Sequence, residues 1–377
     1  MVAIVKILQI YLLRVAIRFL HIFPINTHRV IMNSYRGSQY SCNPKYISEY
    51  LEKTRKLEII WAFNEPEDFV FLKERGIKTV KYSSIKRFYY EATAKVSINN
   101  VGSFSWIPLR KNQEHINTWH AGGSYKKTGL DEAENSLLMK KTIEMTANET
   151  TLFLSSSHYF STVSIPHNLG YNGKILDCGL PRNDNIVKGS GTEITNKVRK
   201  YFHISKELFI LLCAPTWRYN DNKIPVIDFE KVRFSIRKRF GKDCVILYRA
   251  HHITGGTAEG NIVNATDYPD MQELLISADM LITDYSSCIW DYSFTYRPCF
   301  LYTPDLDDYI QKRGFNMDIY EWHFPICKTN TELARAIEDY DEVHHKENMD
   351  KHHMDLGACE TGRACEIIGN QILEWCK

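Results

Sequence analysis

The stretch MQELLISADMLITDYSSCIWD, residues 271–291, decides the fold of this chain. Its amphipathic start leads into residues 278–283, an apolar run of the length of a buried parallel strand, and then into DYSS at 284–287, which are turn and N-cap residues. In an open α/β sheet, phosphorylated ligands bind beyond the carboxyl ends of strands, at helix N-termini. The pattern predicts that Ser286 and Ser287 bind a phosphate; the alternative is that they only cap a helix.

Short apolar runs alternate with helical patterns along the whole chain, which predicts an α/β architecture with parallel sheets. The length of 377 residues exceeds the size at which one hydrophobic core usually stops growing, so we expect two domains. The polar stretch 183–196 predicts the connection between them. Strands are predicted at 30–33, 58–63, 78–81, 96–99, 116–119 and 151–155 in the first half, and at 208–214, 244–249, 279–283 and 299–302 in the second.

Composition excludes several classes of function. A net charge of +2 and the absence of zinc-finger, RNA-recognition or basic-tail patterns argue against a nucleic-acid partner. The ten cysteines form no Cys-x-x-Cys pair, which indicates reduced, buried thiols in a cytosolic protein. Histidines and cysteines gather near the C-terminus, but their spacings match no standard zinc pattern, so we predict no metal site.

The first 25 residues are mostly apolar and are interrupted by Lys6, Arg14 and Arg18. The uncharged stretches are shorter than the roughly 20 residues that span a bilayer, and no small-residue cleavage site marks a signal peptide. Cations among Ile, Leu, Val and Phe suit an amphipathic helix that lies in the headgroup region of a membrane. The alternative is a helix packed on the sheet of the first domain.

Two further groups of side chains follow predicted strands. His120 comes directly after the predicted strand 116–119 and before Ala-Gly-Gly, which suits an exposed base, although a lone histidine is usually structural. Arg249 and His251 follow the apolar strand residues 244–248, so they should emerge at the same edge as DYSS and bind an anion. The alternative for Arg249 is an ion pair with a core carboxylate such as Asp284.

The chain resembles the CDP-glycerol:poly(glycerophosphate) glycerophosphotransferase family, whose bacterial members assemble teichoic acids and capsules. The run LITDYSSCIWDYSFTYRPCFLYTPDLDDYIQKRGF at 281–315 is similar to the signature of that family. Further blocks resemble it in the same order: NSYRGSQYSCNPKYISEYL at 33–51, NTWHAGGSYKKTGLD at 117–131, GLPRND at 179–184, LLCAPTWR at 211–218 and YRAHH at 248–252. The resemblance therefore covers nearly the whole chain.

The resemblance implies a glycosyltransferase-B-like fold in which two Rossmann-like domains face a cleft. We expect a membrane-associating helix at 1–25, an acceptor domain at 26–184 and a CDP-donor domain at 185–377, with the last helix crossing back onto the first domain. The implied reaction transfers a polyol phosphate, glycerol phosphate above all, from a CDP-polyol to a hydroxyl of a lipid-linked glycan or polyol-phosphate acceptor and releases CMP. The implied location is peripheral, on the cytoplasmic face of the bacterial plasma membrane. No cofactor is required, and a divalent cation, the polyol, the acceptor and the oligomeric state stay open.

The resemblance also assigns roles to individual residues. His120 would be the base and His251 would donate to the leaving phosphate. The residues expected at the donor phosphates are Arg249, Ser286, Ser287, Asp284, Arg218 and Arg313, and those expected on the acceptor side are Lys126, Lys127 and Arg182. The sequence departs from the family at Ala121, where Gly is usual, and at His252, where Pro is usual.

Two other functions compete. A nucleotide-sugar glycosyltransferase or epimerase would share the fold, but the chain lacks the Gly-rich opening loop and acidic sugar-binding block common in those enzymes. A non-catalytic partner of a membrane assembly would not need His120, Arg249 and Ser286 together. The lack of a large module before the family domain resembles the shorter members, which add one or a few units.

Overall fold

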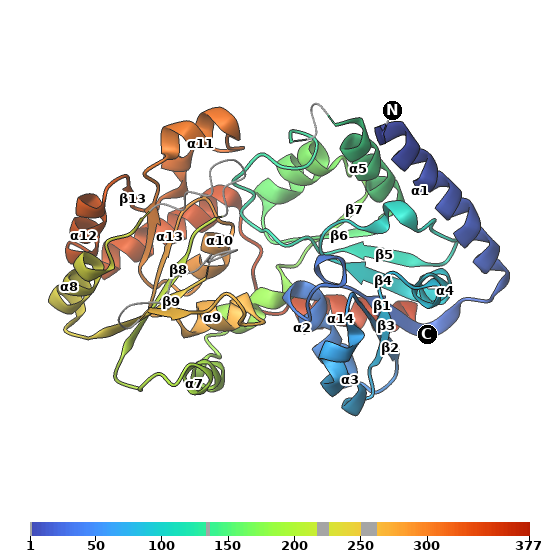
Figure 1. The fold of residues 1–377 in the computed structure, drawn as a ribbon, viewed down its shortest axis with the longest axis horizontal. Coiled ribbons are helices and arrows are strands. Elements are labelled where there is room, and N and C mark those ends of the chain that lie inside the picture. The colour runs from blue at the N-terminus through green and yellow to red at the C-terminus, as the bar shows by residue number, and fades with distance from the viewer. Residues whose placement is uncertain (1, 133–135, 217–225, 250–261) are drawn as a thin grey trace. The chain divides into compact units, whose positions relative to one another are not determined.

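The structure is a computed structural model that describes residues 2–132, 136–216, 226–249 and 262–377. The chain divides into two compact units (Figure 1). Unit 1 consists of Met1–Gly122, Lys127–Asp184 and Ala358–Lys377, and unit 2 consists of Gly123–Lys126 and Asn185–Gly357. The main chain passes from unit 1 to unit 2 after residue 184, and the N-terminal helix and the C-terminal helix both belong to unit 1.

Unit 1 is built on a parallel sheet of seven strands within the described residues, in the order β3-β2-β1-β4-β5-β6-β7. The strands are β1 Asn26–Met32, β2 Glu58–Phe63, β3 Lys78–Lys81, β4 Ala94–Asn99, β5 Glu114–Asn117, β6 Leu152–Ser155 and β7 Lys174–Asp177. The register pairs Val30 of the central strand with Ile59 on one side and Val96 on the other. The inner strands of such a sheet are buried on both faces, so strands such as β2 and β6 are largely continuous apolar runs.

The α-helices of unit 1 begin before β1 and continue between and after the strands. They are α1 Val2–Phe19, α2 Cys42–Glu52, α3 Val70–Glu74, α4 Ile85–Thr93, α5 Leu137–Glu149, α6 Asp184–Val187 at the boundary, and α14 Ala364–Trp375. Helix α14 packs beside α2, and its N-terminus is capped by Asp184, whose carboxylate accepts the N–H groups of Ala364 and Cys365, both at 2.9 Å. The C-terminal helix is thereby tied to unit 1.

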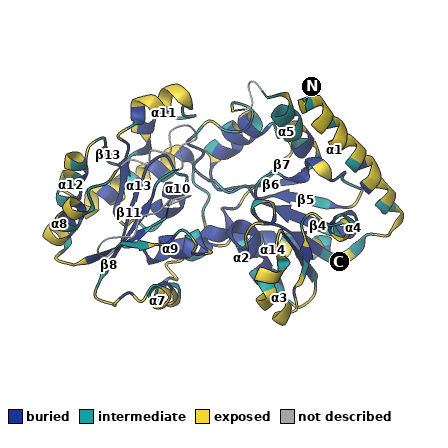
Figure 2. Ribbon diagram, in the orientation of Figure 1, coloured by how far each residue is buried: buried dark blue, intermediate teal, exposed yellow. Residues whose placement is uncertain are grey.

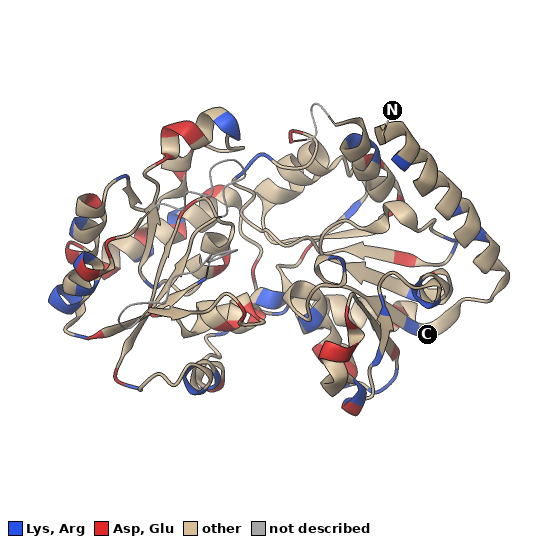
Figure 3. Ribbon diagram, in the orientation of Figure 1, with Lys and Arg blue, Asp and Glu red and all other residues tan. Residues whose placement is uncertain are grey.

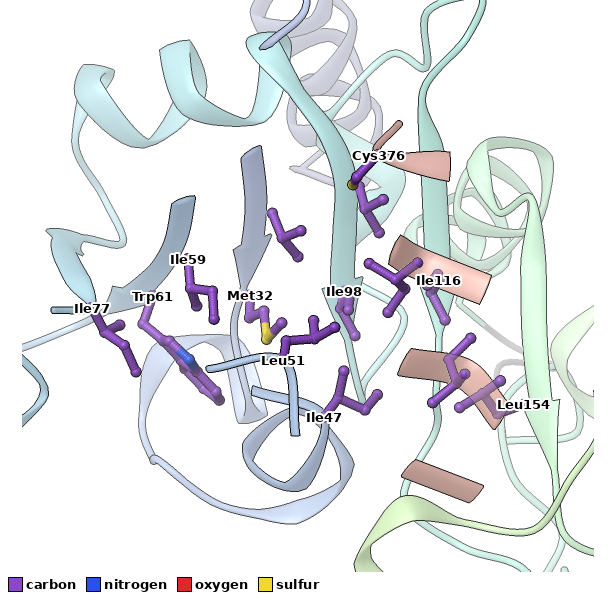
Figure 4. Packing of buried hydrophobic residues seen from close by; sticks show 14 of the residues in the cluster. Met32, Ile47, Leu51, Ile59, Trp61, Ile77, Ile98, Ile116, Leu154 and Cys376 are labelled. Atoms are coloured by element: carbon purple, nitrogen blue, oxygen red, sulfur yellow. The ribbon is translucent and has the colours of Figure 1, made fainter. Parts of the chain in front are cut away.

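A buried cluster on one face of this sheet joins strands to α2 and α14 (Figure 4). Met32, Trp61 and Ile98 from neighbouring strands are at most 1% exposed, and Ile47 and Leu51 of α2 pack against them. Burial of side chains of this size contributes about 1.5–3 kcal/mol each. The core holds the sheet rigid beneath the loops at its carboxyl edge.

Helix α1 has two different faces. Ile10, Arg14 and Ile17 are buried, and the Arg14 guanidinium pairs with Glu149 of α5. Most of the other apolar residues are exposed, as the mostly yellow helix in Figure 2 shows; Leu12 is 69% and Phe19 is 71% exposed. Figure 3 marks Lys and Arg residues but no Asp or Glu residue on this helix. Within the described residues, no helix is long and apolar enough to span a membrane.

Unit 2 is built on a parallel sheet that has six strands in the part of the chain described, in the order β10-β9-β8-β11-β12-β13. The strands are β8 Phe209–Ala214, β9 Cys244–Tyr248, β10 Ile262–Asn264, β11 Met280–Thr283, β12 Cys299–Tyr302 and β13 Ile326–Cys327. The helices are α7 Thr192–Tyr201, α8 Phe229–Phe240, α9 Met271–Ser277, α10 Cys288–Ser293, α11 Leu306–Lys312, α12 Asn330–Glu338 and α13 Glu342–Leu356.

The predicted strands all occur, and three of them, at 58–63, 78–81 and 299–302, have the predicted bounds. The strand predicted at 116–119 is β5 and ends earlier, at Asn117. Strands β7, β10 and β13 were not predicted because each is short and is not fully buried, so no apolar run marks it.

Candidate active site

Each sheet has one point at which its strand order changes direction. In unit 1 the chain builds β2 and β3 on one side of β1 and then continues with β4 on the other side. In unit 2 the corresponding neighbours are β8 and β11. Ligands of open α/β sheets bind beyond the carboxyl ends of the strands at such a switch point. Each unit therefore has one location at which its candidate residues are expected.

His120 lies at the switch point of unit 1. Its Nδ1 is 2.7 Å from the carbonyl oxygen of Asn100, the residue that follows β4. The ring of Tyr35, from the segment after β1, meets the His120 ring edge-on with the centroids 5.7 Å apart. The histidine thus contacts the loops that follow both strands of the switch point.

The hydrogen bond to Asn100 determines which nitrogen of His120 can act as a base. A carbonyl oxygen only accepts, so Nδ1 carries the hydrogen of this bond. In the neutral imidazole the lone pair then lies on Nε2. The half-buried ring is therefore held in the tautomer that suits proton abstraction through Nε2.

The main chain before His120 is strained. Trp119 has a φ of 47°, which is rare for a bulky residue, and its N–H donates to the Asn117 side chain at 3.0 Å. Tyr35 and Arg36, on the neighbouring loop, also have positive φ values of 47° and 56°. Such conformations cost about 1–3 kcal/mol each and persist where the surroundings enforce them, commonly at functional sites.

Arg182, predicted on the acceptor side, is only 4% exposed. Its Nη1 donates to the carbonyl oxygen of His120 at 2.8 Å and lies 3.3 Å from the sulfur of Cys42. The structure thus places this guanidinium against the main chain of the candidate base.

Lys126 and Lys127, the other residues predicted on the acceptor side, fall in different units. Lys126 belongs to the segment Gly123–Lys126, which is part of unit 2, and it forms a β-bridge with Phe315. Tyr125 anchors this segment: it is 2% exposed, and its hydroxyl is 2.7 Å from Nε2 of His352. Lys127 is exposed in unit 1.

At the switch point of unit 2, Asp284 joins the loops after β8 and β11. It is 1% exposed, and its two oxygens accept the N–H of Thr216 at 2.9 and 3.0 Å. The N–H of Tyr285 also donates to it, at 2.6 Å. The Asp284 carboxylate therefore holds the turn that carries the serines.

The two serines are half-buried within a run of fully buried residues. Ser287 is the N-cap residue of α10, yet its hydroxyl makes no cap hydrogen bond. Ser286 Oγ is 3.4 Å from the N–H of Cys288, a long contact. The alternative in which both serines serve only as caps predicts a cap hydrogen bond that Ser287 does not make.

Arg249 follows β9 and is also half-buried. Its Nη1 donates to the carbonyl oxygens of Tyr268, at 2.6 Å, and Ala265, at 3.4 Å, which holds the side chain at the carboxyl edge of the sheet. His251 and Arg218 lie outside the described residues.

Arg313 directly follows α11. Aromatic residues on either side of it in the chain stack on the serine turn. The ring of Tyr285 stacks on Tyr309 with centroids 3.8 Å apart and contacts Phe315 at 5.6 Å. The hydroxyl of Tyr285 donates to Asp305 at 2.9 Å. The structure therefore brings the arginine segment and DYSS together in one packed group.

Sequence reasoning missed the residues that hold the site in unit 1, namely Asn43, Asn100 and Tyr35. Asn43 and Asn100 are 0% exposed, which is unusual for asparagine. The pair Asn99-Asn100, at the last residue of β4 and directly after it, was a usable signal, because polar side chains at a strand end shape the following loop.

The histidines near the C-terminus have structural partners. Among them, His345 bonds to the carbonyl oxygen of Arg297 at 2.9 Å, and His353 bonds to Ser293 Oγ at 2.7 Å. Burial lowers the pKa of His353 to about 4, so the ring is neutral. In the described part of the chain, no group of three or more His, Cys, Asp or Glu side chains could hold a metal ion.

Comparison with known proteins agrees with the resemblance. The model of the family described as CDP-Glycerol:Poly(glycerophosphate) glycerophosphotransferase matches residues 15–374. The teichoic acid glycerol-phosphate transferase of Staphylococcus aureus (strain NCTC 8325 / PS 47) is 31% identical over 335 residues, which are 84% of this chain and 85% of the relative.

Two polymerases and one solved structure extend this agreement. The teichoic acid poly(glycerol phosphate) polymerase of Bacillus spizizenii is 28% identical over 95% of both chains. For the polymerase of Bacillus subtilis (strain 168) the identity is 27%, and the match covers 93% of this chain but only 49%, about half, of the relative. The structure of the wall teichoic acid polymerase TagF aligns with a TM-score of 0.80 and 25% identity, over 93% of this chain and 90% of that one. The predicted α/β fold of glycosyltransferase-B type, with two parallel sheets, is confirmed.

Proposed function

Because the chain belongs to the CDP-glycerol:poly(glycerophosphate) glycerophosphotransferase family, we propose that it transfers glycerol phosphate from CDP-glycerol to an acceptor hydroxyl in teichoic-acid synthesis. The acceptor is a lipid-linked glycan or polyol phosphate, and the second product is CMP. The observation that carries the catalytic part is the 2.7 Å hydrogen bond that fixes the tautomer of His120.

In the proposed reaction His120 is the general base. Its Nε2 removes the proton of the acceptor hydroxyl, and the oxygen attacks the phosphorus that bears glycerol. A new P–O bond forms while the P–O bond to the bridging oxygen breaks, so CMP leaves with that oxygen and its electron pair. A positioned base of this kind typically contributes 100- to 10,000-fold in rate.

The donor phosphates are bound at the switch point of unit 2. The hydroxyls of Ser286 and Ser287 donate to phosphate oxygens, while Asp284 orients their turn through its contacts to Thr216. Arg249 and Arg313 supply positive charge that offsets the charge of the diphosphate. His251 protonates or hydrogen-bonds the departing phosphate, and Arg218 adds a further cation. The proposal requires no metal ion.

The protein acts as a peripheral protein at the cytoplasmic face of the plasma membrane. The support is helix α1, whose buried face packs on unit 1 while its other face exposes large apolar side chains beside Lys6 and Arg18. Apolar groups that enter the headgroup region and cations that meet anionic lipids together favour such binding. The buried face of the helix agrees with the alternative of a packed helix, and the exposed face supports the proposed membrane contact.

The experiment that tests the function measures CMP release. The purified protein is incubated with a lipid-linked acceptor and with CDP-glycerol, CDP-ribitol or UDP-N-acetylglucosamine. We expect acceptor-dependent CMP release with CDP-glycerol, and release at least about 100-fold slower with the His120→Ala variant. Release of UDP from the nucleotide sugar, without turnover of any CDP-polyol, would instead establish the glycosyltransferase alternative.

A further inference from the structure

We propose that Asn43 and Arg182 are positioning residues for His120. They position its ring by holding the main chain at and directly before it. The inference rests on the proposed function, in which His120 is the base. All of the contacts that carry it lie within unit 1. Neither residue needs to touch a substrate for this role.

Asn43 holds the two peptide groups before His120. Its side-chain amide donates to the carbonyl oxygens of Thr118, at 3.2 Å, and Trp119, at 3.0 Å. Its side-chain oxygen accepts the N–H of Arg182 at 3.2 Å. Asn43 is 0% exposed, so water does not compete for these hydrogen bonds.

Arg182 holds the next peptide group. Its guanidinium donates to the carbonyl oxygen of His120 at 2.8 Å. The carbonyl groups of three consecutive residues, Thr118, Trp119 and His120, are therefore fixed by one asparagine and one arginine that bond to each other. These two residues are 139 positions apart in the chain, so only the folded unit brings them together.

This arrangement explains how the strained main chain before the base persists. Trp119 keeps a φ of 47° although an ordinary conformation is available to it in an unrestrained loop. If Trp119 relaxed, the backbone of His120 would turn and the bond from Nδ1 to the Asn100 carbonyl would be lost. Displacement of a reacting group by about 1 Å can cost on the order of 100-fold in rate. Asn43 and Arg182 therefore set both the direction and the tautomer of the ring.

The test uses full-length Arg182→Gln and Asn43→Ala, with Arg182→Lys as the conservative variant. We expect kcat to fall about 10- to 100-fold, with the KM for CDP-glycerol changed by less than about twofold. Arg182→Lys should retain more activity than Arg182→Gln, because an ammonium still donates to the His120 carbonyl. The matched control is Arg110→Gln: Arg110 also donates to carbonyl oxygens in unit 1, those of Phe23 and Ala92, and should leave kcat unchanged.

Two further readouts separate positioning from a general structural role. Nitrogen NMR of the His120 ring should show one tautomer, with the hydrogen on Nδ1, in the native protein and a mixture in both variants. In a His120→Ala background, Arg182→Gln should add less than about a twofold loss, because its effect passes through the missing ring. Thermal melting verifies that each variant is folded; if Arg182→Gln does not fold, Arg182→Lys and Asn43→Ala carry the same measurements.

The outcomes distinguish this inference from the proposed function. If His120→Ala keeps more than about a tenth of the turnover, His120 is not the base and the proposed function fails. If His120→Ala is inactive while the Arg182 and Asn43 variants keep the native kcat and a single tautomer, the positioning inference is wrong. An additive loss in the His120→Ala background would also overturn it, because Arg182 would then act on something else.

Discussion

The carboxyl edges of the two sheets share one topology but carry different chemistry. At the switch point of unit 1, the His120 ring contacts the carbonyl of Asn100 and the ring of Tyr35. Asn43 and Arg182 hold the main chain beside that ring. At the switch point of unit 2, a buried carboxylate, Asp284, holds a turn that presents hydroxyls.

The difference follows from what each edge has to bind. A carboxylate beside a base raises its pKa and keeps it protonated, whereas a backbone carbonyl orients the ring without adding a negative charge beside it. A diphosphate needs donors, which a turn fixed through its N–H groups and side chains can provide. One strand order therefore supports two kinds of site, because the residues that follow the strands decide the chemistry.

The largest effect is expected at the edge of unit 1. His120→Ala should lower turnover about 100- to 10,000-fold and leave CDP-glycerol binding nearly intact, since the base acts on the acceptor. Turnover at saturating acceptor and calorimetric titration with CDP-glycerol measure the two effects. His28→Ala, an exposed histidine in β1, is the matched control. A variant that lost donor affinity and turnover equally would assign His120 to donor binding instead.

The second effect concerns a buried histidine of unit 1. Burial lowers the pKa of His115 to about 4, against about 6.5 in the unfolded chain. As the pH falls, the unfolded chain binds a proton at His115 before the folded protein does. The contribution of His115 to the free energy of unfolding is therefore present above about pH 6.5 and is lost as the pH falls towards 4. The loss is roughly 3 kcal/mol.

Urea unfolding of the native protein and of His115→Gln, at pH 7 and pH 4, measures this difference. The variant should lose less stability on acidification than the native protein, because it lacks the titrating ring. His345, His352 and His353 of unit 2 also have lowered pKa values and titrate in both proteins, so they cancel in the comparison. Equal losses in the two proteins would show that His115 does not contribute.

The third effect tests the edge of unit 2. Replacing both Ser286 and Ser287 by Ala should weaken CDP-glycerol binding at least about tenfold, because hydrogen bonds to charged groups are worth about 1.5–3 kcal/mol each. Thr329→Ala is the matched control, since Thr329 is a true N-cap whose side chain accepts the N–H of Glu332 at 3.1 Å. The control should lose about 1 kcal/mol of stability and no affinity. The reverse pattern, a destabilised double variant with native affinity, would make the serines caps.

The smallest effect concerns the surface. Unit 1 gathers exposed apolar residues on α1, and Leu12→Glu should weaken binding to anionic vesicles severalfold while leaving soluble turnover unchanged. Val343→Glu, at a 68% exposed apolar residue of unit 2, is the control and should bind as the native protein does. Sedimentation with vesicles at low and high salt measures both. Native binding by Leu12→Glu would contradict the membrane role of α1.

Local patterns were sufficient to predict the strands that are fully buried. Apolar runs such as those of β2 and β12 are readable because every residue of a strand covered on both faces is buried. The edge strands β10 and β13 were missed because their exposure interrupts that pattern. The serine turn and His120 were also predictable, since polar residues directly after an apolar run mark the carboxyl edge of a parallel sheet.

By itself, the sequence determined the family, the α/β class and the residues that follow the strands at the two switch points. Only the tertiary structure decided that Arg182 is buried against His120, that Tyr125 belongs to unit 2 and that Asp184 caps α14. Arg182 bonds to a residue 62 positions away, and Asp184 bonds to a residue 180 positions away. Tyr125 is held in unit 2 by its contact with His352. Propensity and periodicity act over a few residues, so they carry no information about such partners, whereas burial penalises a polar group that lacks one.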